Sequence, residues 1–422
     1  MKKTEKNREK SNIILSVVIM LVMATLVVFI SDKLSKTSYE DESIADDLNE
    51  EIQEELVIWY YDAIYTDYIE AISAEFKEDY DVDVTFKKVS ADGYLEAINQ
   101  ANVNNEDYPD VYILPEEMLE KAYLGGLAQI NEHDKKYSED KFSKTALSSI
   151  TYKNKKVAYP LSFDVGFLVY NNKYVKETPK TFDDIIEYAE NFDGEDFPDV
   201  MKVLEWNPAE ILYNYGFVGA YMECGGENGD DTSIFDITND NVKSSLKYYT
   251  KLQEYFSIEM ENVTDKSILD DFEKGKIVYT IASMDSYNYF SEKKIDLKVC
   301  EFPDLTTELQ SRSLATTNVV VVNPFSNYLR DAERLAMYMT YDKPEYVYEF
   351  TGRLSPMAYE YEEENLNAIL ECYDSAVVMP KLMNTLDYKQ RLTVTLNNIW
   401  NGQGIKKSLK VLEDEMSMDM KK

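Results

Sequence analysis

The sequence predicts an α/β fold with two lobes, each a mainly parallel sheet flanked by helices. The first observation is length, because 422 residues are too many for a single hydrophobic core. The second is that strand-like and helix-like segments alternate from Leu56 onward, which is typical of βαβ units and a parallel sheet. The third is an interruption at Pro160, after which the alternation resumes, so we expect the chain to change lobes there.

The first lobe begins at residues 56–61, an apolar run that predicts a buried strand. Ile69, Ile72 and Phe76 then follow at the spacing of one helix face. Two more pairs of a strand and a helix are expected, at residues 82–89 with 94–101 and at residues 110–114 with 118–126. Successive units of this kind predict right-handed crossovers between parallel strands.

Residues 150–171 predict how the chain leaves the first lobe. Two short β-prone runs joined at Asn154-Lys155 predict a hairpin. Pro160 has no N–H group to donate to a central ladder, so the sheet should stop or change at this residue. An apolar run at residues 167–170 then predicts one buried strand of the second lobe.

The second lobe repeats the alternation of helix and strand. Thr181, with Asp184 three residues later, predicts the N-cap and N3 positions of its first helix. Apolar residues at a spacing of three to four predict a long amphipathic helix over residues 242–256. The remaining predicted elements are a helix at 211–221, a strand at 277–281, a returning strand at 316–323, a helix at 332–341 and C-terminal helices from about residue 386.

In order and spacing, these elements resemble the maltose-binding-protein type of bacterial extracellular solute-binding protein. Tyr159-Pro160, with the acidic Asp164 four positions past the proline, carries the resemblance. It is supported by the run from Phe272 to Lys276 before a strand, and by Val377 to Pro380, which is similar to the family's third crossing between lobes. The resemblance covers roughly residues 56–415 and implies a periplasmic-binding-protein-like fold of type II, with lobes joined by hinge crossovers.

The domain limits follow from these crossings. We expect residues 56–162 and 318–376 to form the first lobe, and residues 163–317 and 377–422 to form the second. Closure is then a hinge motion about the segments near 161–165, 316–319 and 378–380.

The N-terminus predicts a membrane anchor. Residues 1–12 are basic, and the apolar run over residues 13–30 is about 27 Å long as a helix, close to the hydrocarbon thickness of a bilayer. The basic residues place that end in the cytoplasm and the rest of the chain outside. A cleaved signal peptide would need an A-x-A-like site, and a lipid anchor, usual in Gram-positive members of the family, would need a cysteine nearer than Cys224. We therefore expect a single-pass protein of the cell membrane in a Gram-positive bacterium, with an acidic stalk at 31–55.

Charge and motifs argue against several classes of function. A net charge of −35 is unsuited to nucleic acid or to an anionic membrane surface. No G-x-S-x-G elbow, Walker A loop or dinucleotide fingerprint occurs, and the single histidine, His133, lies in a polar run. Three scattered cysteines are too few for a zinc site. We therefore expect neither an enzyme nor a cofactor or metal.

The first lobe suggests three ligand-binding residues. Ligands of open α/β sheets bind beyond the carboxyl ends of the strands. This rule selects Tyr61 and Asp62 after the first strand and Glu117 after the third. Carboxylates accept hydrogen bonds from hydroxyls, and aromatic faces pack on pyranose rings. The two acids have an alternative interpretation as ordinary loop residues or charges at helix N-termini.

The resemblance implies further ligand contacts at the hinge and in the second lobe. Asp164 matches an acidic ligand-contacting position, and Trp206 falls in a region that supplies an aromatic platform, although it is equally explained as packed under a loop. Asp285 stands where the family usually has a tryptophan that stacks on sugar, so Tyr287 or Tyr289 is expected to substitute.

The expected function is capture of a small solute, with an oligosaccharide favoured, for delivery to the permease subunits of an ABC importer. The carboxylates of Asp62, Glu117, Asp164 and Asp285 equally suit a cationic ligand, such as a polyamine or an amino sugar. A sensor or scaffold with the same fold is a further alternative, because the membrane anchor and the missing tryptophan do not require transport. A polysaccharide-acting enzyme is the least favoured hypothesis.

Overall fold

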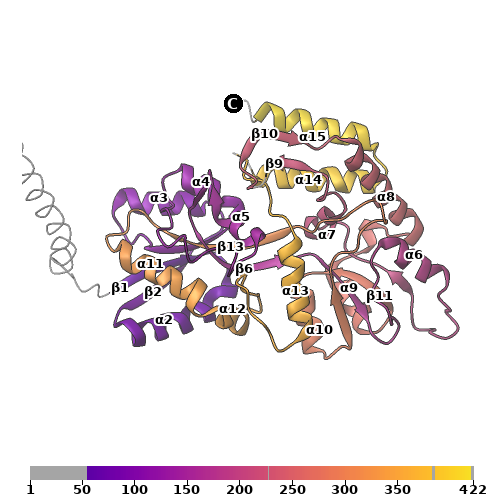
Figure 1. Cartoon of the computed structure of the whole chain (residues 1–422), viewed down its shortest axis with the longest axis horizontal. Helices are drawn as coiled ribbons and strands as arrows, with labels where there is room; N and C mark the ends of the chain where they lie inside the picture. The colour runs from indigo at the N-terminus through magenta and orange to yellow at the C-terminus, as the bar shows by residue number, and fades with distance from the viewer. Residues whose placement is uncertain (1–54, 227, 383–384, 420–422) are drawn as a thin grey trace, which may run out of the picture. The chain divides into compact units, whose positions relative to one another are not determined.

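The computed structural model describes residues 55–226, 228–382 and 385–419, which form two lobes (Figure 1). The predicted cytoplasmic segment 1–12, the predicted anchor 13–30 and all but the last residue of the predicted stalk lie outside the described residues. Within the described ranges, no helix combines the length and the apolar character that crossing a bilayer requires.

The first lobe is built on a five-stranded sheet. Its strands, in order across the sheet, are β2 (Asp83–Lys88), β1 (Glu55–Tyr60), β3 (Val111–Pro115), β13 (Ala315–Val322) and β6 (Tyr159–Val165). The three strands β1, β2 and β3 run parallel, as the alternating pattern predicts, whereas β13 is antiparallel to both of its neighbours. The helices of this lobe are α2 (Thr66–Tyr80), α3 (Tyr94–Asn104), α4 (Leu119–Leu124), α5 (Lys144–Ile150), α11 (Leu329–Met337) and α12 (Pro344–Thr351).

The second lobe is built on a four-stranded sheet. Its strands, in order, are β12 (Leu297–Cys300), β7 (Phe167–Asn171), β11 (Ile277–Ala282) and β8 (Lys202–Leu204). A separate hairpin pairs β9 (Glu223–Gly225) with β10 (Asp231–Asp236). The helices are α6 (Phe182–Glu190), α7 (Ile211–Asn214), α8 (Asp240–Phe256), α9 (Asp265–Glu273), α10 (Met284–Glu292), α14 (Thr385–Trp400) and α15 (Ile405–Asp419).

The prediction of mainly parallel sheets is wrong for the second lobe and half right for the first. In the second sheet only β11 and β8 are parallel neighbours, and β7 is antiparallel to both β11 and β12. Strands β11 and β12 do run in the same direction, with α10 between them in the chain, but β7 is inserted between them. In each sheet, the strand that follows a crossing between the lobes is antiparallel to both of its neighbours. This strand is β13 in the first sheet and β7 in the second.

The crossing from the first lobe to the second is a single residue. Gly166 alone separates β6 from β7, and a Cβ atom placed on it would lie 2.6 Å from the carbonyl oxygen of Leu212. The Ser313 hydroxyl donates a hydrogen bond to the Gly166 carbonyl, 2.7 Å away, which ties this crossing to the start of the returning one.

Two local predictions near the crossing have different outcomes. The hairpin of β4 (Thr151–Tyr152) and β5 (Lys155–Lys156) exists, but its turn residues are Lys153 and Asn154, both with positive φ. Of the two outcomes predicted at Pro160, a stop or a change, the structure shows a change: β6 is the edge strand and continues through the proline, and its register with β13 shifts beside it.

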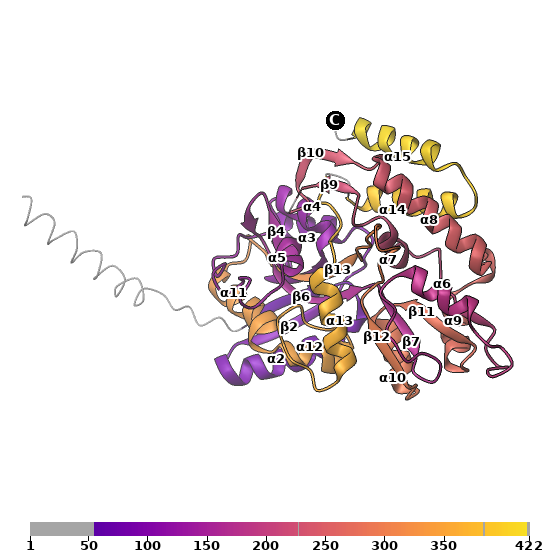
Figure 2. The ribbon, with the colours of Figure 1, turned by 45° about the vertical axis from the view of Figure 1, so that its right-hand side comes forward.

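Helices cover both lobes and the junction between them. Thr181 and Asp184 form the predicted capping box of α6, whereas the predicted helix over 211–221 is only the short α7 followed by a 3-10 turn. The C-terminal helices α14 and α15 pack on α8, as both views show (Figures 1 and 2). Helix α13 (Glu364–Ser375) contacts β12 of one sheet and β6 of the other, so the expected lobe limit near residue 376 stays a prediction.

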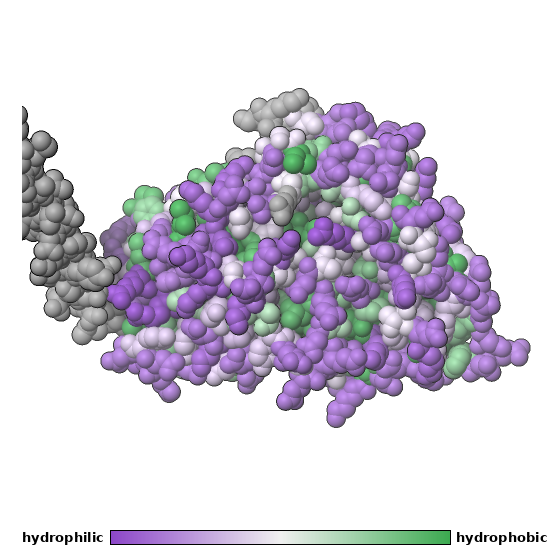
Figure 3. Space-filling view, viewed as in Figure 1, coloured by the Kyte–Doolittle hydropathy of each residue, from purple (hydrophilic) through white to green (hydrophobic). Residues whose placement is uncertain are grey.

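The surface agrees with the strongly acidic composition. In the face shown in Figure 3, hydrophilic residues cover most of the described surface and hydrophobic residues are scattered among them. The buried apolar side chains instead form a core that extends through both sheets.

Candidate ligand-binding site between the lobes

Asp164 lies two residues before the crossing and joins the two lobes through its carboxylate. Its Oδ1 accepts hydrogen bonds from the backbone N–H groups of Val165 and Met284, both at 2.9 Å. Met284 is the first residue of α10, so this bond links β6 of the first sheet to a helix of the second lobe. Burial raises the pKa of the Asp164 carboxyl, and the neighbouring Arg353 opposes that rise.

Arg353 connects Asp164 to Asp285. Its Nη1 lies 2.6 Å from Oδ2 of Asp164, and its Nη2 lies 2.8 Å from the carboxylate of Asp285 in the first turn of α10. The side chains of Arg353 and Asp164 are each 16% exposed, whereas that of Asp285 is 72% exposed. Burial opposes charging of the guanidinium, but the two carboxylates raise the pKa of Arg353 above its ordinary value.

The turn that carries Arg353 belongs to the first lobe. Gly352 ends α12 with a φ of 65°, a left-handed conformation that suits glycine, and α12 packs on α2. The carbonyl of Gly352 accepts a hydrogen bond from the Asn288 side chain of α10 at 2.9 Å. Gly352 and Arg353, two adjacent residues of the first lobe, therefore both bond to α10 of the second lobe.

The three residues predicted from the first sheet lie at the ends of β1 and β3. The Tyr61 hydroxyl donates to Oδ1 of Asn318 at 2.8 Å, and its ring packs edge-on against Tyr94. Asp62 is exposed and caps the short 3-10 helix after it by accepting from the N–H of Ile64, the alternative that the sequence had left open. Glu117 forms an ion pair with Lys389 of α14.

Residues 71–366 match the profile of the family described as bacterial extracellular solute-binding protein. The chain belongs to this family. It is 28% identical over 272 residues to the maltooligosaccharide ABC transporter solute-binding lipoprotein of Streptococcus pneumoniae R6, a match that covers 62% of each chain. It is 25% identical over 339 residues to the maltodextrin-binding protein MdxE of Bacillus subtilis, covering 75% of this chain and 78% of that one. The match thus spans less than two thirds of the pneumococcal relative.

Solved structures show the same fold. A cyclo/maltodextrin-binding protein complexed with maltotetraose superposes with a TM-score of 0.76 at 16% identity, covering 88% of this chain and 98% of that one. The extracellular solute-binding protein of Staphylococcus aureus in complex with maltose gives a TM-score of 0.75 at 19% identity, covering 88% and 99%. The two-lobed solute-binding fold predicted from the sequence is therefore confirmed.

Two aromatic residues expected to contact the ligand of this solute-binding protein are core residues. Trp206 is fully buried, donates from Nε1 to Asn214 at 3.1 Å, and packs against Phe217 and Trp400. Tyr287 is 1% exposed, and its hydroxyl donates to Glu363. This burial indicates a packing role for both side chains, and ligand contact at Trp206 and Tyr287 stays a prediction.

The alternative aromatic residue, Tyr289, is also engaged. Its hydroxyl donates to Glu273 at the end of α9, 2.5 Å away. A tyrosine that the sequence did not suggest, Tyr213 of α7, reaches Ser283 with its hydroxyl at 3.4 Å, directly before α10. No motif marks Tyr213, because its place depends on α7 being a short helix that brings it beside α10.

A buried acid and a buried lysine lie close to the crossings of this solute-binding protein. Glu116 is fully buried and accepts a hydrogen bond from the N–H of Thr317 at 2.6 Å. Burial, together with the charge of Glu117, raises the pKa of the Glu116 carboxyl to about 8. Burial lowers the pKa of Lys381 to about 8, and its ammonium group donates to carbonyls on both lobes, those of Ser148 and Asn228.

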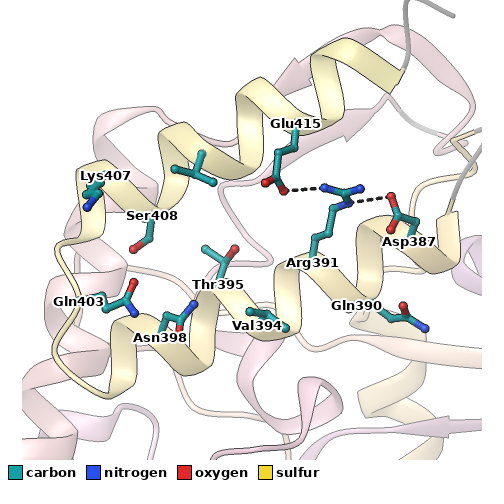
Figure 4. Close-up of a pocket in the computed structure, with 11 residues that line it drawn as sticks. Asp387, Gln390, Arg391, Val394, Thr395, Asn398, Gln403, Lys407, Ser408 and Glu415 are labelled. Atoms are coloured by element: carbon teal, nitrogen blue, oxygen red, sulfur yellow. Dashed lines mark hydrogen bonds and ion pairs between the residues drawn. The ribbon is translucent and has the colours of Figure 1, made fainter.

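Two pockets lie away from the cluster of Asp164, Arg353 and Asp285. One, of about 380 Å³, lies between α14 and α15, where Arg391 pairs with Asp387 and Glu415 (Figure 4). The other, of about 710 Å³, lies between α5, the segment 374–380 and the hairpin β9–β10. The seven predicted ligand residues line neither of these two pockets. In the part of the chain that the structure describes, no cluster of His, Cys, Asp and Glu is arranged to hold a metal ion.

Proposed function

We propose that this solute-binding protein captures a neutral oligosaccharide between its lobes and presents it to the permease subunits of an ABC importer. The matched relatives support the ligand class, since the names of the curated ones refer to maltooligosaccharides and maltodextrin. The position of Asp164 and Asp285 supports the location, because Asp164 lies on β6 of the first sheet, Asp285 lies on α10 of the second lobe, and both carboxylates bind Arg353. A ligand held there contacts both lobes only when they are together, and therefore favours the closed state.

One observation favours a neutral ligand over a cationic one. Of the four carboxylates that would attract a polyamine or an amino sugar, three are already paired with cations of the chain itself. Asp164 and Asp285 share Arg353, and Glu117 is paired with Lys389. Only Asp62 of the four keeps an exposed carboxylate without an ion pair among the described residues. Paired carboxylates still accept hydrogen bonds from sugar hydroxyls, because each oxygen has two lone pairs.

The location of the chain in the cell is part of the same proposal. We place the lobes outside the cell, held by the predicted membrane-spanning segment 13–30 and the stalk 31–55, with residues 1–12 in the cytoplasm. The lobe limits 56–162 with 318–376 and 163–317 with 377–422 belong to the proposal as well, although β6 and β13 of the first sheet each extend three residues beyond them. Membership of the solute-binding family supports binding without turnover. A sensor with the same fold would be encoded beside a histidine kinase, whereas an importer would be encoded beside two permeases.

Calorimetric titration of the full chain in detergent tests the proposal. Maltose, maltotriose and maltotetraose are the neutral ligands, and spermidine and a glucosamine oligosaccharide are the cationic ones. We expect binding of the neutral sugars, with at least tenfold weaker binding by Asp164→Asn and no change in the matched exposed variant Asp199→Asn. Binding of the cationic compounds alone would overturn the proposal. The absence of binding by any of the compounds would favour the sensor hypothesis.

A further inference from the structure

Arg353 supplies positive charge to a site where a cationic ligand would otherwise be expected. Its two terminal nitrogens each bind a carboxylate, one on β6 and one on α10. Its side chain is 16% exposed, so the guanidinium lies within the junction and does not extend into solvent. The other groups close to it are the hydroxyl of Tyr65, which is bonded to Ser162, and the backbone N–H of Met284.

The charge of the cluster depends on this one residue. With Arg353 present, the two carboxylates and the guanidinium carry a net charge of about −1, and without it the two acids would form a paired anionic site. The side chain of Asp164 is 16% exposed, and a largely buried carboxylate needs a compensating partner. Arg353 satisfies that need inside the chain, from a turn that α12 and the Asn288 bond hold in place. To bind there, a free cation would have to displace the guanidinium of Arg353. The effective concentration of that group at the two carboxylates is high, because the chain holds it in place.

We infer that Arg353 determines specificity: it occupies the position of a cationic ligand between Asp164 and Asp285, and so excludes amines from the site. The inference rests on the proposed location of the site and adds the reason that the ligand is uncharged. An incoming ammonium group would lie near the guanidinium, and like charges a few ångströms apart in a partly buried site disfavour binding on the order of a hundredfold or more. Hydroxyl groups of a sugar meet no such repulsion.

Arg353→Gln tests this inference, with spermidine as the probe. The full chain carries a net charge of −35 and will bind spermidine weakly at many places, so titrations are made in 150 mM salt and compared between variants. We expect Arg353→Gln to bind spermidine at least tenfold more tightly than the parent chain. The gain should disappear in Arg353→Gln/Asp285→Asn, and Arg353→Lys should resemble the parent chain, because it keeps the charge.

The matched control is Arg334→Gln, which removes an arginine paired with Asp331 on α11, away from this cluster. Equal gains in spermidine affinity for Arg334→Gln and Arg353→Gln would overturn the inference, as would the absence of any gain in Arg353→Gln. The comparison does not depend on sugar binding. If the parent chain does not bind maltotetraose, the proposed function is contradicted. The spermidine comparison still decides the role of Arg353 in that case.

A second measurement applies if an Arg353 variant is not stable enough for titration. In Arg353→Ala the guanidinium is removed, and methylguanidinium at low millimolar concentration is added as a replacement. We expect methylguanidinium to raise the unfolding temperature of Arg353→Ala and to leave that of the parent chain and of Arg334→Ala unchanged. An equal effect on all three proteins would show that the space left by Arg353 is no cation site.

Discussion

Glu117 and Lys389 form an ion pair between the end of β3 in the first lobe and α14 among the C-terminal helices. The side chain of Glu117 is 7% exposed and that of Lys389 is 25% exposed, so the pair is largely shielded from solvent. It is a second charged contact between the lobes, separate from that of Arg353. Because salt screens a largely buried pair much less than an exposed one, this pair ties the lobes together at physiological ionic strength.

A double-mutant cycle should show that this pair couples the lobes. Glu117→Gln and Lys389→Met each leave one charge without its partner, and a partly buried unpaired charge is destabilising. We expect a coupling energy of about 0.5–3 kcal/mol between the two substitutions in the free energy of unfolding from urea denaturation. Additive effects would mean that the pair contributes nothing. The exposed pair of Lys266 and Asp270, given the same cycle, provides the comparison.

Trp206 should matter for stability and not as a sugar platform. Because it is fully buried against Phe217 and Trp400, Trp206→Ala is expected to lower the free energy of unfolding by about 3–5 kcal/mol. Trp206→Phe keeps the ring packing and loses the bond to Asn214, so its effect should be smaller. Chemical denaturation measures both. If Trp206→Ala kept normal stability but lost sugar binding, the result would support the predicted role of Trp206 as an aromatic platform for sugar.

Glu116 should make stability depend on pH. Burial raises the pKa of its carboxyl from 4.5 to about 8, so its contribution to stability is complete below pH 4.5 and is lost as pH rises toward 8. Glu116→Gln is neutral at every pH. We therefore expect the parent chain to lose stability relative to this variant between pH 5 and pH 8, by at most about 1.4 kcal/mol per pH unit.

The pH series uses the difference between the two proteins, in which the contribution of Glu120 is common to both, whereas that of Lys381 changes because the charge of Glu116 raises the pKa of Lys381. Glu70→Gln, on the exposed face of α2, is the matched control and should follow the parent chain at all pH values. A constant difference between the parent chain and Glu116→Gln would show that Glu116 keeps the same charge throughout this range.

The capping box of α6 offers a local test of stability. The Thr181 hydroxyl accepts from the N–H of Asp184 at 3.1 Å, and the Asp184 carboxylate accepts from the N–H of Thr181 at 2.8 Å. Thr181→Ala should destabilise the protein by about 1 kcal/mol, whereas Thr181→Ser keeps the cap and should cost much less. Thermal unfolding of the two variants decides this, and equal losses would assign the effect to packing of the threonine methyl group.

The sequence predicted features that depend on near neighbours. The hairpin before β6, the cap at Thr181 and the parallel strands β1 to β3 each follow from residues a few positions apart. The direction of neighbouring strands in the second sheet did not follow, because β7 enters that sheet from the other lobe. Local periodicity carries no information about which strand is inserted between two others.

The candidate site was predictable only in its carboxylates. Asp164 and Asp285 were selected by the resemblance, but their partner Arg353 is 189 residues from Asp164 in the chain and carries no motif. The expectation that Asp164 and Asp285 lie close together was the available signal that a cation of the chain would be found between them. The sequence left two explanations open for Trp206, because its burial depends on Phe217 and Trp400, and the sequence does not reveal that the three rings meet.

The glycine between β6 and β7 gives the molecule a mechanical linkage. A side chain at Gly166 would collide with the carbonyl of Leu212, so this backbone contact is closer than any other residue type permits. A change of angle between the two strands therefore presses directly on α7, one residue from Tyr213. We therefore expect a hinge motion at Gly166 to displace α7, and Tyr213 with it, so that the angle of the lobes and the position of Tyr213 change together.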